Sequence, residues 1–159
     1  MAKRQKPYDW SQFTLRIVVA APVSRVFEAW TKDRIVSKWF TEKTKIEPTK
    51  GGVVHFEWAA GDKWDTTVTA ISKNRYFQFP FGTKGEQVKV SFKKAGKGTI
   101  CEIHQFGMKT GAQDKAVMHL GCTQGWTFFL ANLKAYLEHG IDLRAHDPKR
   151  SYRQKYVNS

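Results

Sequence analysis

The sequence predicts an α+β domain in which a curved antiparallel sheet of about six to seven strands wraps around one long C-terminal helix. Apolar and polar residues alternate in several short segments between residues 13 and 106, which is the period of strands with one buried face. Residues 114–138 instead carry an apolar stripe with helical spacing. Because the strands come first and the long helix last, an antiparallel α+β arrangement is favoured over alternating βα units.

The first strand is followed by two short helices. Alternation in the strand involves Phe13, Leu15, Ile17 and Val19. The segment Ala-Pro-Val-Ser at 21–24 provides a stop and a cap, after which apolar residues recur at i, i+3, i+4 and i+7, namely Val23, Val26, Phe27 and Trp30. A second short helix is predicted over residues 33–39.

The following strands are expected to form a meander. Gly51-Gly52 opens a strand whose inward residues are Val54, Phe56 and Trp58, and a turn at Gly61-Asp62 leads to a strand carrying Trp64, Thr66, Val68 and Ala70. Further strands are predicted over 75–80, 86–93 and 99–106, with a turn at 95–98 between the last two.

A single amphipathic helix is predicted over residues 114–138. One face of it carries Cys122, Trp126, Phe129, Leu130, Leu133 and Leu137, and Gly140 is expected to end it. An aromatic-rich sheet covered by one helix is expected to leave space between the two layers.

Length and charge predict one domain with basic ends. The 159 residues, 41% of them hydrophobic, suffice for one core, placed at 13–143 between a basic N-terminal tail at 1–12 and a basic, solvated C-terminal tail at 144–159. The tails include Lys3 and Arg4 at one end and Arg144, Lys149 and Arg150 at the other. A net charge of +13 fits either solubility or attraction to an acidic partner, and both interpretations stay open.

Several function classes find little support in the sequence. No export signal or apolar run of about 20 residues is present, so a cytoplasmic protein without a membrane span is expected. Cys101 and Cys122 cannot form a metal site by themselves, and no catalytic motif or phosphate-binding loop points to an enzyme or a cofactor. Because the aromatic residues share strand faces with aliphatic ones, nucleic-acid binding is disfavoured.

A resemblance to a known superfamily extends over about residues 13–143. It lies in Ala-Pro-Val-Ser-Arg-Val-Phe-Glu-Ala-Trp at 21–30, Trp-Phe at 39–40, Gly-Gly-Val-Val-His-Phe at 51–56 and Gly-Trp at 125–126 with the following leucines. These motifs resemble the SRPBCC superfamily, which includes START-like and birch-pollen-allergen-like proteins. Within it, the chain is most similar to the family of the C-terminal domain of the heat-shock-protein-90 ATPase activator. The resemblance implies a helix-grip fold.

The resemblance implies non-catalytic binding of a small hydrophobic molecule, lipid-like or aromatic, between the sheet and the C-terminal helix. The residues expected to line that cavity are Trp30, Trp39, Phe56, Trp58, Trp64, Thr66, Phe77, Phe79, Ile103, Gln105, His119, Cys122, Trp126 and Phe129. Gln105 stands where the family usually has a histidine, which weakens any role based on a pocket imidazole. Three alternatives stay open: a co-chaperone or other module that binds an acidic protein, a cyclase-type enzyme, and pairing of two copies as a homodimer.

Overall fold

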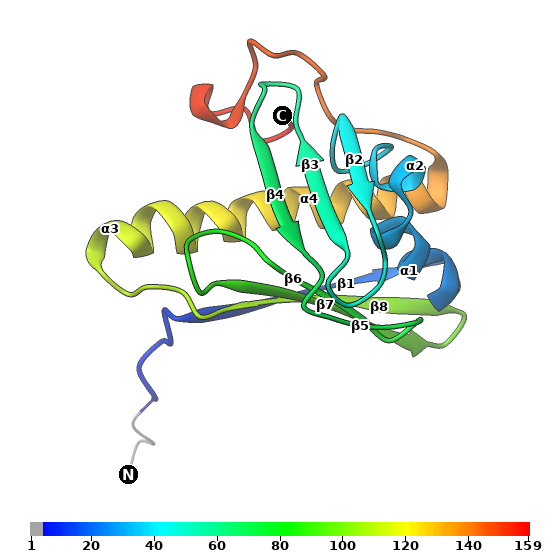
Figure 1. Ribbon diagram of the computed structural model, residues 1–159, viewed down its shortest axis with the longest axis horizontal. Helices are drawn as coiled ribbons and strands as arrows, with labels where there is room; N and C mark the ends of the chain where they lie inside the picture. The colour runs from blue at the N-terminus through cyan, green and yellow to red at the C-terminus, as the bar shows by residue number, and fades with distance from the viewer. Residues whose placement is uncertain (1–4) are drawn as a thin grey trace.

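The computed structural model describes residues 5–159 and confirms the predicted fold class (Figure 1). A five-stranded antiparallel sheet in the order β1-β8-β7-β6-β5 and a three-stranded sheet in the order β2-β3-β4 face the long helix α4. The first sheet consists of β1 (Gln12–Val19), β5 (Ala70–Ser72), β6 (Tyr76–Pro80), β7 (Gln87–Ala95) and β8 (Gly98–Phe106). The second consists of β2 (Lys43–Ile46), β3 (Val53–Glu57) and β4 (Lys63–Thr67).

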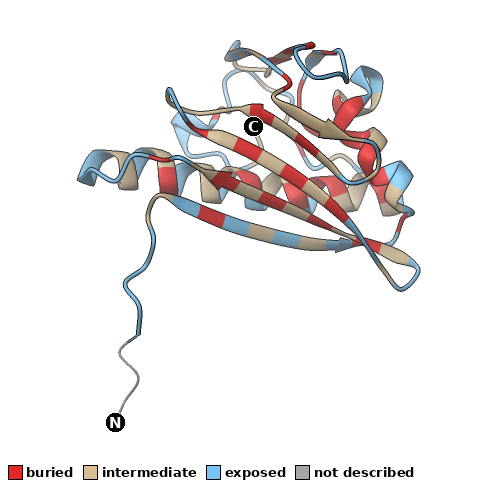
Figure 2. Ribbon diagram, turned by 60° about the horizontal axis from the view of Figure 1, so that its bottom comes forward, coloured by how far each residue is buried: buried red, intermediate tan, exposed pale blue. Residues whose placement is uncertain are grey.

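Register in the five-stranded sheet brings the apolar residues of neighbouring strands directly opposite one another. One row across the strands consists of Leu15, Ile103, Val90, Phe77 and Ile71. Buried and more accessible residues alternate along the strands in Figure 2, as the period of two predicts. The face toward α4 is therefore apolar, and the opposite face meets solvent.

Within residues 5–159 the structure has eight strands, more than the six to seven predicted. Residues 64–70 were predicted as one strand, but the chain changes sheets near Val68 and Thr69. The Val68 amide donates to the carbonyl of Gly52, the residue before β3, whereas the Thr69 amide donates to the carbonyl of Gln78 in β6, each over 2.9 Å. Strand β2 was not predicted because only Ile46 of its four residues is buried.

The helices lie close to where the periodicity places them, although α2 is shorter than the helix predicted over residues 33–39 and a short 3₁₀ helix lies at Tyr152–Gln154. Helices α1 (Val23–Thr31) and α2 (Asp33–Val36) follow β1, and α4 (Leu120–His139) ends at Gly140, which adopts the left-handed conformation at φ 67°. A short α3 (Ala112–Asp114) and a π-helical turn, η1 (Lys115–His119), precede α4. The π-helical turn was not predicted, and such turns occur frequently at functional sites.

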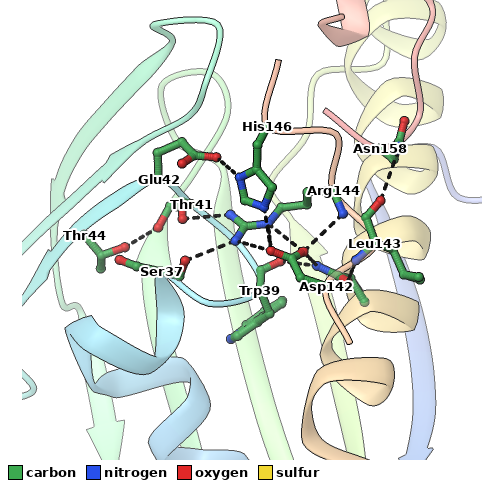
Figure 3. Close-up of polar contacts among 11 residues, drawn as sticks. Ser37, Trp39, Thr41, Glu42, Thr44, Asp142, Leu143, Arg144, His146 and Asn158 are labelled. Atoms are coloured by element: carbon green, nitrogen blue, oxygen red, sulfur yellow. Dashed lines mark hydrogen bonds and ion pairs between the residues drawn. The ribbon is translucent and has the colours of Figure 1, made fainter. Parts of the chain in front are cut away.

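The C-terminal segment is not a solvated tail at its beginning, because Arg144 is buried (Figure 3). Its guanidinium forms an ion pair with Asp142 over 2.9 Å and donates to the carbonyls of Thr41 at 2.7 Å and Ser37 at 3.1 Å. The sequence-based boundary at residue 143 therefore cuts through a hydrogen-bonded unit. Lys3 and Arg4, assigned to the N-terminal tail, lie outside the described residues.

Two further side chains connect this segment to the domain. Asn132 of α4 donates to the Trp39 carbonyl at 2.6 Å and accepts from the Leu143 amide at 2.7 Å. His146 contacts Glu42 and Asp142, its nitrogen lying 2.7 Å from the Asp142 carboxylate. Burial raises the pKa of Asp142, but hydrogen bonds from Arg144, Asn132 and His146 outweigh it and hold that pKa well below its ordinary value.

Two glycines of α4, Gly121 and Gly125, lie on a side of the helix that has free space around it. A Cβ atom built at Gly121 or Gly125 meets nothing within 4 Å, and glycine in a helix costs about 1 kcal/mol relative to alanine. Gly121→Ala and Gly125→Ala are therefore each expected to raise the free energy of unfolding by about 0.5–1 kcal/mol in urea titrations. As a matched control, Gly82→Ala is expected to destabilise the protein, because Gly82 has φ +102° and its Cβ would lie 2.0 Å from Glu86. A loss of stability in both helix variants would contradict the open surroundings of these glycines.

Candidate functional site

The space between the sheets and α4 is occupied by a cluster of aromatic rings. At its centre is Phe40, which is 1% exposed and follows helix α2. Its ring centroid lies 4.8–6.2 Å from those of six others: Trp30, Trp39, Phe56, Trp58, Trp126 and Phe129. Rings at these separations, mostly edge-to-face or offset, pack favourably. All six belong to the set predicted from the sequence to line a cavity.

Two hollows of the described surface lie away from this cluster. One is on the solvent face of the five-stranded sheet and is lined by Arg16, Ser91, Lys93, Ile100 and Glu102. Another lies where α1 begins and β7 turns into β8. Neither of these two lies between the sheet and α4, where the aromatic rings pack against one another.

A line of polar side chains crosses this apolar interior. The Trp126 indole donates to the Gln105 side-chain oxygen at 2.9 Å, and the Gln105 amide donates to the Glu86 carboxylate at 3.2 Å. Gln105 is fully buried and Glu86 is 1% exposed. The Gln105 side-chain oxygen has to face the Trp126 N–H, and the Gln105 side-chain nitrogen has to face the Glu86 carboxylate. Exchanging the oxygen and nitrogen would place donor against donor and acceptor against acceptor, so only one orientation of the amide satisfies both bonds.

The hairpin between β6 and β7 directs Glu86 inward. Thr83 donates to the Glu86 carboxylate at 2.6 Å, while the Glu86 amide donates to the Thr83 carbonyl at 3.0 Å. Gly82 lies against the carboxylate, where any larger residue would collide with it.

Cys122 of α4 is near the same cluster, and burial raises the pKa of its thiol to about 11. A thiol with that pKa is uncharged and weakly nucleophilic at neutral pH.

The accessible side of this interior is formed by three half-buried side chains, two of them aromatic. Phe81 follows β6, with its ring 5.4 Å from those of both Trp64 and Trp126. The Trp64 indole donates to the Pro80 carbonyl at 2.9 Å, which closes the gap between β4 and β6. The Met118 side chain comes from the π-helical turn and lies beside Gly82. We call Phe81, Trp64 and Met118 the entrance residues.

The other predicted site residues are distributed unevenly around this interior. Phe77, Phe79 and Ile103 are fully buried on the inner face of the five-stranded sheet, and Phe79 contacts Phe56 at 5.7 Å. Thr66 is half-buried on β4.

Glu86 was not among the predicted residues. The alternation of β7 shows Val88 and Val90 as inward, and two residues earlier the same period reaches Glu86, which is the signal that could have identified it.

His119 has its contacts with the N-terminal segment. It is 2% exposed, with one ring nitrogen 2.8 Å from the Tyr8 hydroxyl and the other 3.0 Å from the Trp10 carbonyl. The rings of Tyr8, Trp10 and Phe13 lie 5.0–5.4 Å from the imidazole. Both nitrogens are therefore occupied, and the predicted role of His119 at a pocket mouth has no free imidazole group to support it. The same contacts hold residues 8–10, predicted as tail, against the domain.

The chemistry available at the site is recognition of a polar group within an apolar surrounding. Within residues 5–159, no three His, Cys, Asp or Glu side chains are placed to hold a metal ion. No helix in the described chain is long and apolar enough to cross a membrane. The arrangement thus offers a hydrogen-bonding carboxylate, an amide and aromatic rings.

The comparisons with known proteins agree with the fold. A family model described as "Activator of Hsp90 ATPase homolog 1-like protein" matches residues 20–138. A comparison with curated protein sequences gives no match.

Solved structures from three bacteria are similar to this chain. Protein SSP2350 of Staphylococcus saprophyticus is 21% identical with a TM-score of 0.74, over 84% of this chain and 96% of that chain. The Aha1 dimer from Colwellia psychrerythraea is 21% identical with a TM-score of 0.71, over 81% and 97% of the two chains. Protein MLL2253 of Mesorhizobium loti is 17% identical with a TM-score of 0.71, over 82% and 98%. At these identities the similarity shows the fold.

Proposed function

Because the chain belongs to the Activator of Hsp90 ATPase homolog 1-like family, we propose that it is a non-catalytic binding domain that holds a small apolar molecule between its sheet and α4. The observation that carries the proposal is the buried polar line of Trp126, Gln105 and Glu86 within an otherwise aromatic interior. Polar groups in an apolar interior are costly, and a few such groups among apolar walls are typical of ligand sites.

The entrance residues provide the route into the interior. Met118 is an unbranched side chain that adapts its shape and lies on a π-helical turn, and Phe81 precedes Gly82, which has φ +102°. We infer that outward rotation of the Phe81 side chain uncovers the Trp126 ring, which lies 5.4 Å from it. The ligand then takes the place of this side chain against the same rings.

Isothermal titration calorimetry with 1-naphthylmethanol as the apolar probe tests this function. We expect Trp126→Ala to reduce the affinity of the probe at least about tenfold, since it removes both a ring surface and the group that orients Gln105. Trp10→Ala is the matched control, because Trp10 is a half-buried tryptophan at the N-terminal segment. Equal affinities of both variants and the parent protein, each measured while folded, would place the probe outside the interior and reject the proposal.

A second candidate function is association with an acidic protein, favoured by the net charge of +13. Arg16, Lys89 and Lys93 lie on the solvent face of the five-stranded sheet. Such association has to weaken steeply with added salt, because exposed charges are screened. Purification at low and high salt, with native mass spectrometry of each sample, separates the two candidates: an apolar molecule is retained at both, an acidic protein only at low salt.

A further inference from the structure

We propose that the molecule held at this site carries a cationic amine that forms an ion pair with Glu86, an inference that rests on the proposed function. Glu86 is 1% exposed, and its two carboxylate oxygens accept hydrogen bonds from the neutral groups of Thr83 and Gln105. Each carboxylate oxygen therefore has one neutral hydrogen-bonding partner.

No positive charge within residues 5–159 balances this carboxylate. The ion pairs of the described chain involve other acidic residues, chiefly on its surface, and the buried Arg144 is paired with Asp142. Burying an ionised carboxylate without a cation is costly, and two neutral hydrogen bonds offset only part of that cost. A cation supplied by a ligand removes the remainder.

The fold does not require a charge at position 86. A glutamine there would accept from Gln105 through its oxygen and donate to the Thr83 hydroxyl, which is able to accept as well as donate. The same two contacts would then be kept without burying a charge. Glutamate rather than glutamine is therefore expected at position 86 if its negative charge binds part of the ligand.

The surroundings of Glu86 define the rest of the ligand. The Phe81 amide donates to the Glu86 carbonyl at 3.3 Å, so the Phe81 ring is attached to the same hairpin, 5.4 Å from Trp126. Aromatic faces attract cations as well as apolar rings. The expected ligand class is a flat apolar ring system bearing a protonated amine, and a carboxylate at the same position would be repelled.

Three probes with the same ring test this inference by calorimetry at pH 7: 1-naphthylmethylammonium, 1-naphthylmethanol and 1-naphthoate. The parent protein is expected to bind the ammonium probe at least about tenfold more tightly than the alcohol, and the carboxylate most weakly. In Glu86→Gln the preference for the ammonium over the alcohol is expected to disappear. Glu102→Gln, which removes a carboxylate on the outer sheet face, is the control and keeps the preference.

Each outcome of this experiment decides a different point. Equal binding of ammonium and alcohol by the parent protein, or a preference that survives in Glu86→Gln, overturns the amine inference and leaves the apolar site standing. Absence of binding by all three probes removes the proposed function and the inference together. Urea titration of Glu86→Gln shows whether the variant is folded, and an unfolded variant would overturn the argument that glutamine satisfies the same contacts.

Discussion

Replacing Arg144 with alanine is expected to lower the free energy of unfolding by about 3 kcal/mol or more. Its guanidinium is buried and connects the Asp142 carboxylate with the carbonyls of Thr41 and Ser37. Removing it leaves a partly buried carboxylate and two carbonyl oxygens without their donors. Urea denaturation followed by far-ultraviolet circular dichroism measures the loss.

The matched control is Arg150→Ala, six residues further along the same segment. Arg150 is paired with Asp147, but its side chain is 60% exposed, so its loss is expected to change the free energy of unfolding by no more than about 0.5 kcal/mol. Arg144→Lys is expected to lie between the two, because lysine cannot donate to three partners in one plane. If Arg144→Ala is as stable as Arg150→Ala, the C-terminal segment contributes nothing to folding and the solvated tail predicted from sequence is right.

Replacing Phe40 with alanine is expected to cost about 3–5 kcal/mol of stability. Phe40 is almost completely buried and contacts six aromatic residues from four parts of the chain, so its loss leaves a void that rigid rings cannot fill. Phe40→Leu keeps much of the volume and should lose markedly less. Thermal and urea unfolding of the three proteins provide the comparison.

The same variant has a second readout, because an apolar void binds small apolar molecules. Phe40→Ala is expected to bind benzene or indole and to regain stability when either is added, whereas the parent protein is not stabilised by them to the same extent. Phe106→Ala, which truncates a half-buried ring on the outer sheet face, is the control for both measurements. A loss in Phe40→Ala no greater than in Phe106→Ala would show that Phe40 is not the centre of the interior.

The placement of Glu86 shows where prediction of the site stopped. Its partners Gln105 and Trp126 lie 19 and 40 residues further along the chain, and only pairing of β7 with β8 and packing of α4 bring the three together. Trp126 and Gln105 were predicted because they fall on the apolar faces of their elements. The period of two places Glu86 in phase with the inward Val88 and Val90, but a glutamate beside a hairpin turn is usually exposed, so the pattern alone did not select it as a site residue.

For Arg144 and His119, too, the contacts in the structure differ from what the local sequence indicates. Arg144 follows the last helix in a basic stretch, which by composition is a solvated segment, yet it is buried by contacts with residues 37 and 41. His119 was predicted near a pocket mouth from its position on the helix. Its actual partners, Tyr8 and Trp10, are more than 100 residues away in sequence, so local spacing carried no information about them.

The sequence by itself determined the fold class, the order of most elements and many of the rings in the aromatic interior, although Phe40 and Phe81 were not among the predicted residues. These depend on local periodicity, since burial of one face selects apolar residues at every second position in a strand and every third or fourth in a helix. Only the tertiary structure decided where the strand at 64–70 divides, that Arg144 is buried, and that Glu86 is hydrogen-bonded to Gln105 with no ion-pair partner among residues 5–159. Those features depend on contacts between residues far apart in sequence, and the pattern of residues along one chain does not record which distant polar groups become neighbours after folding.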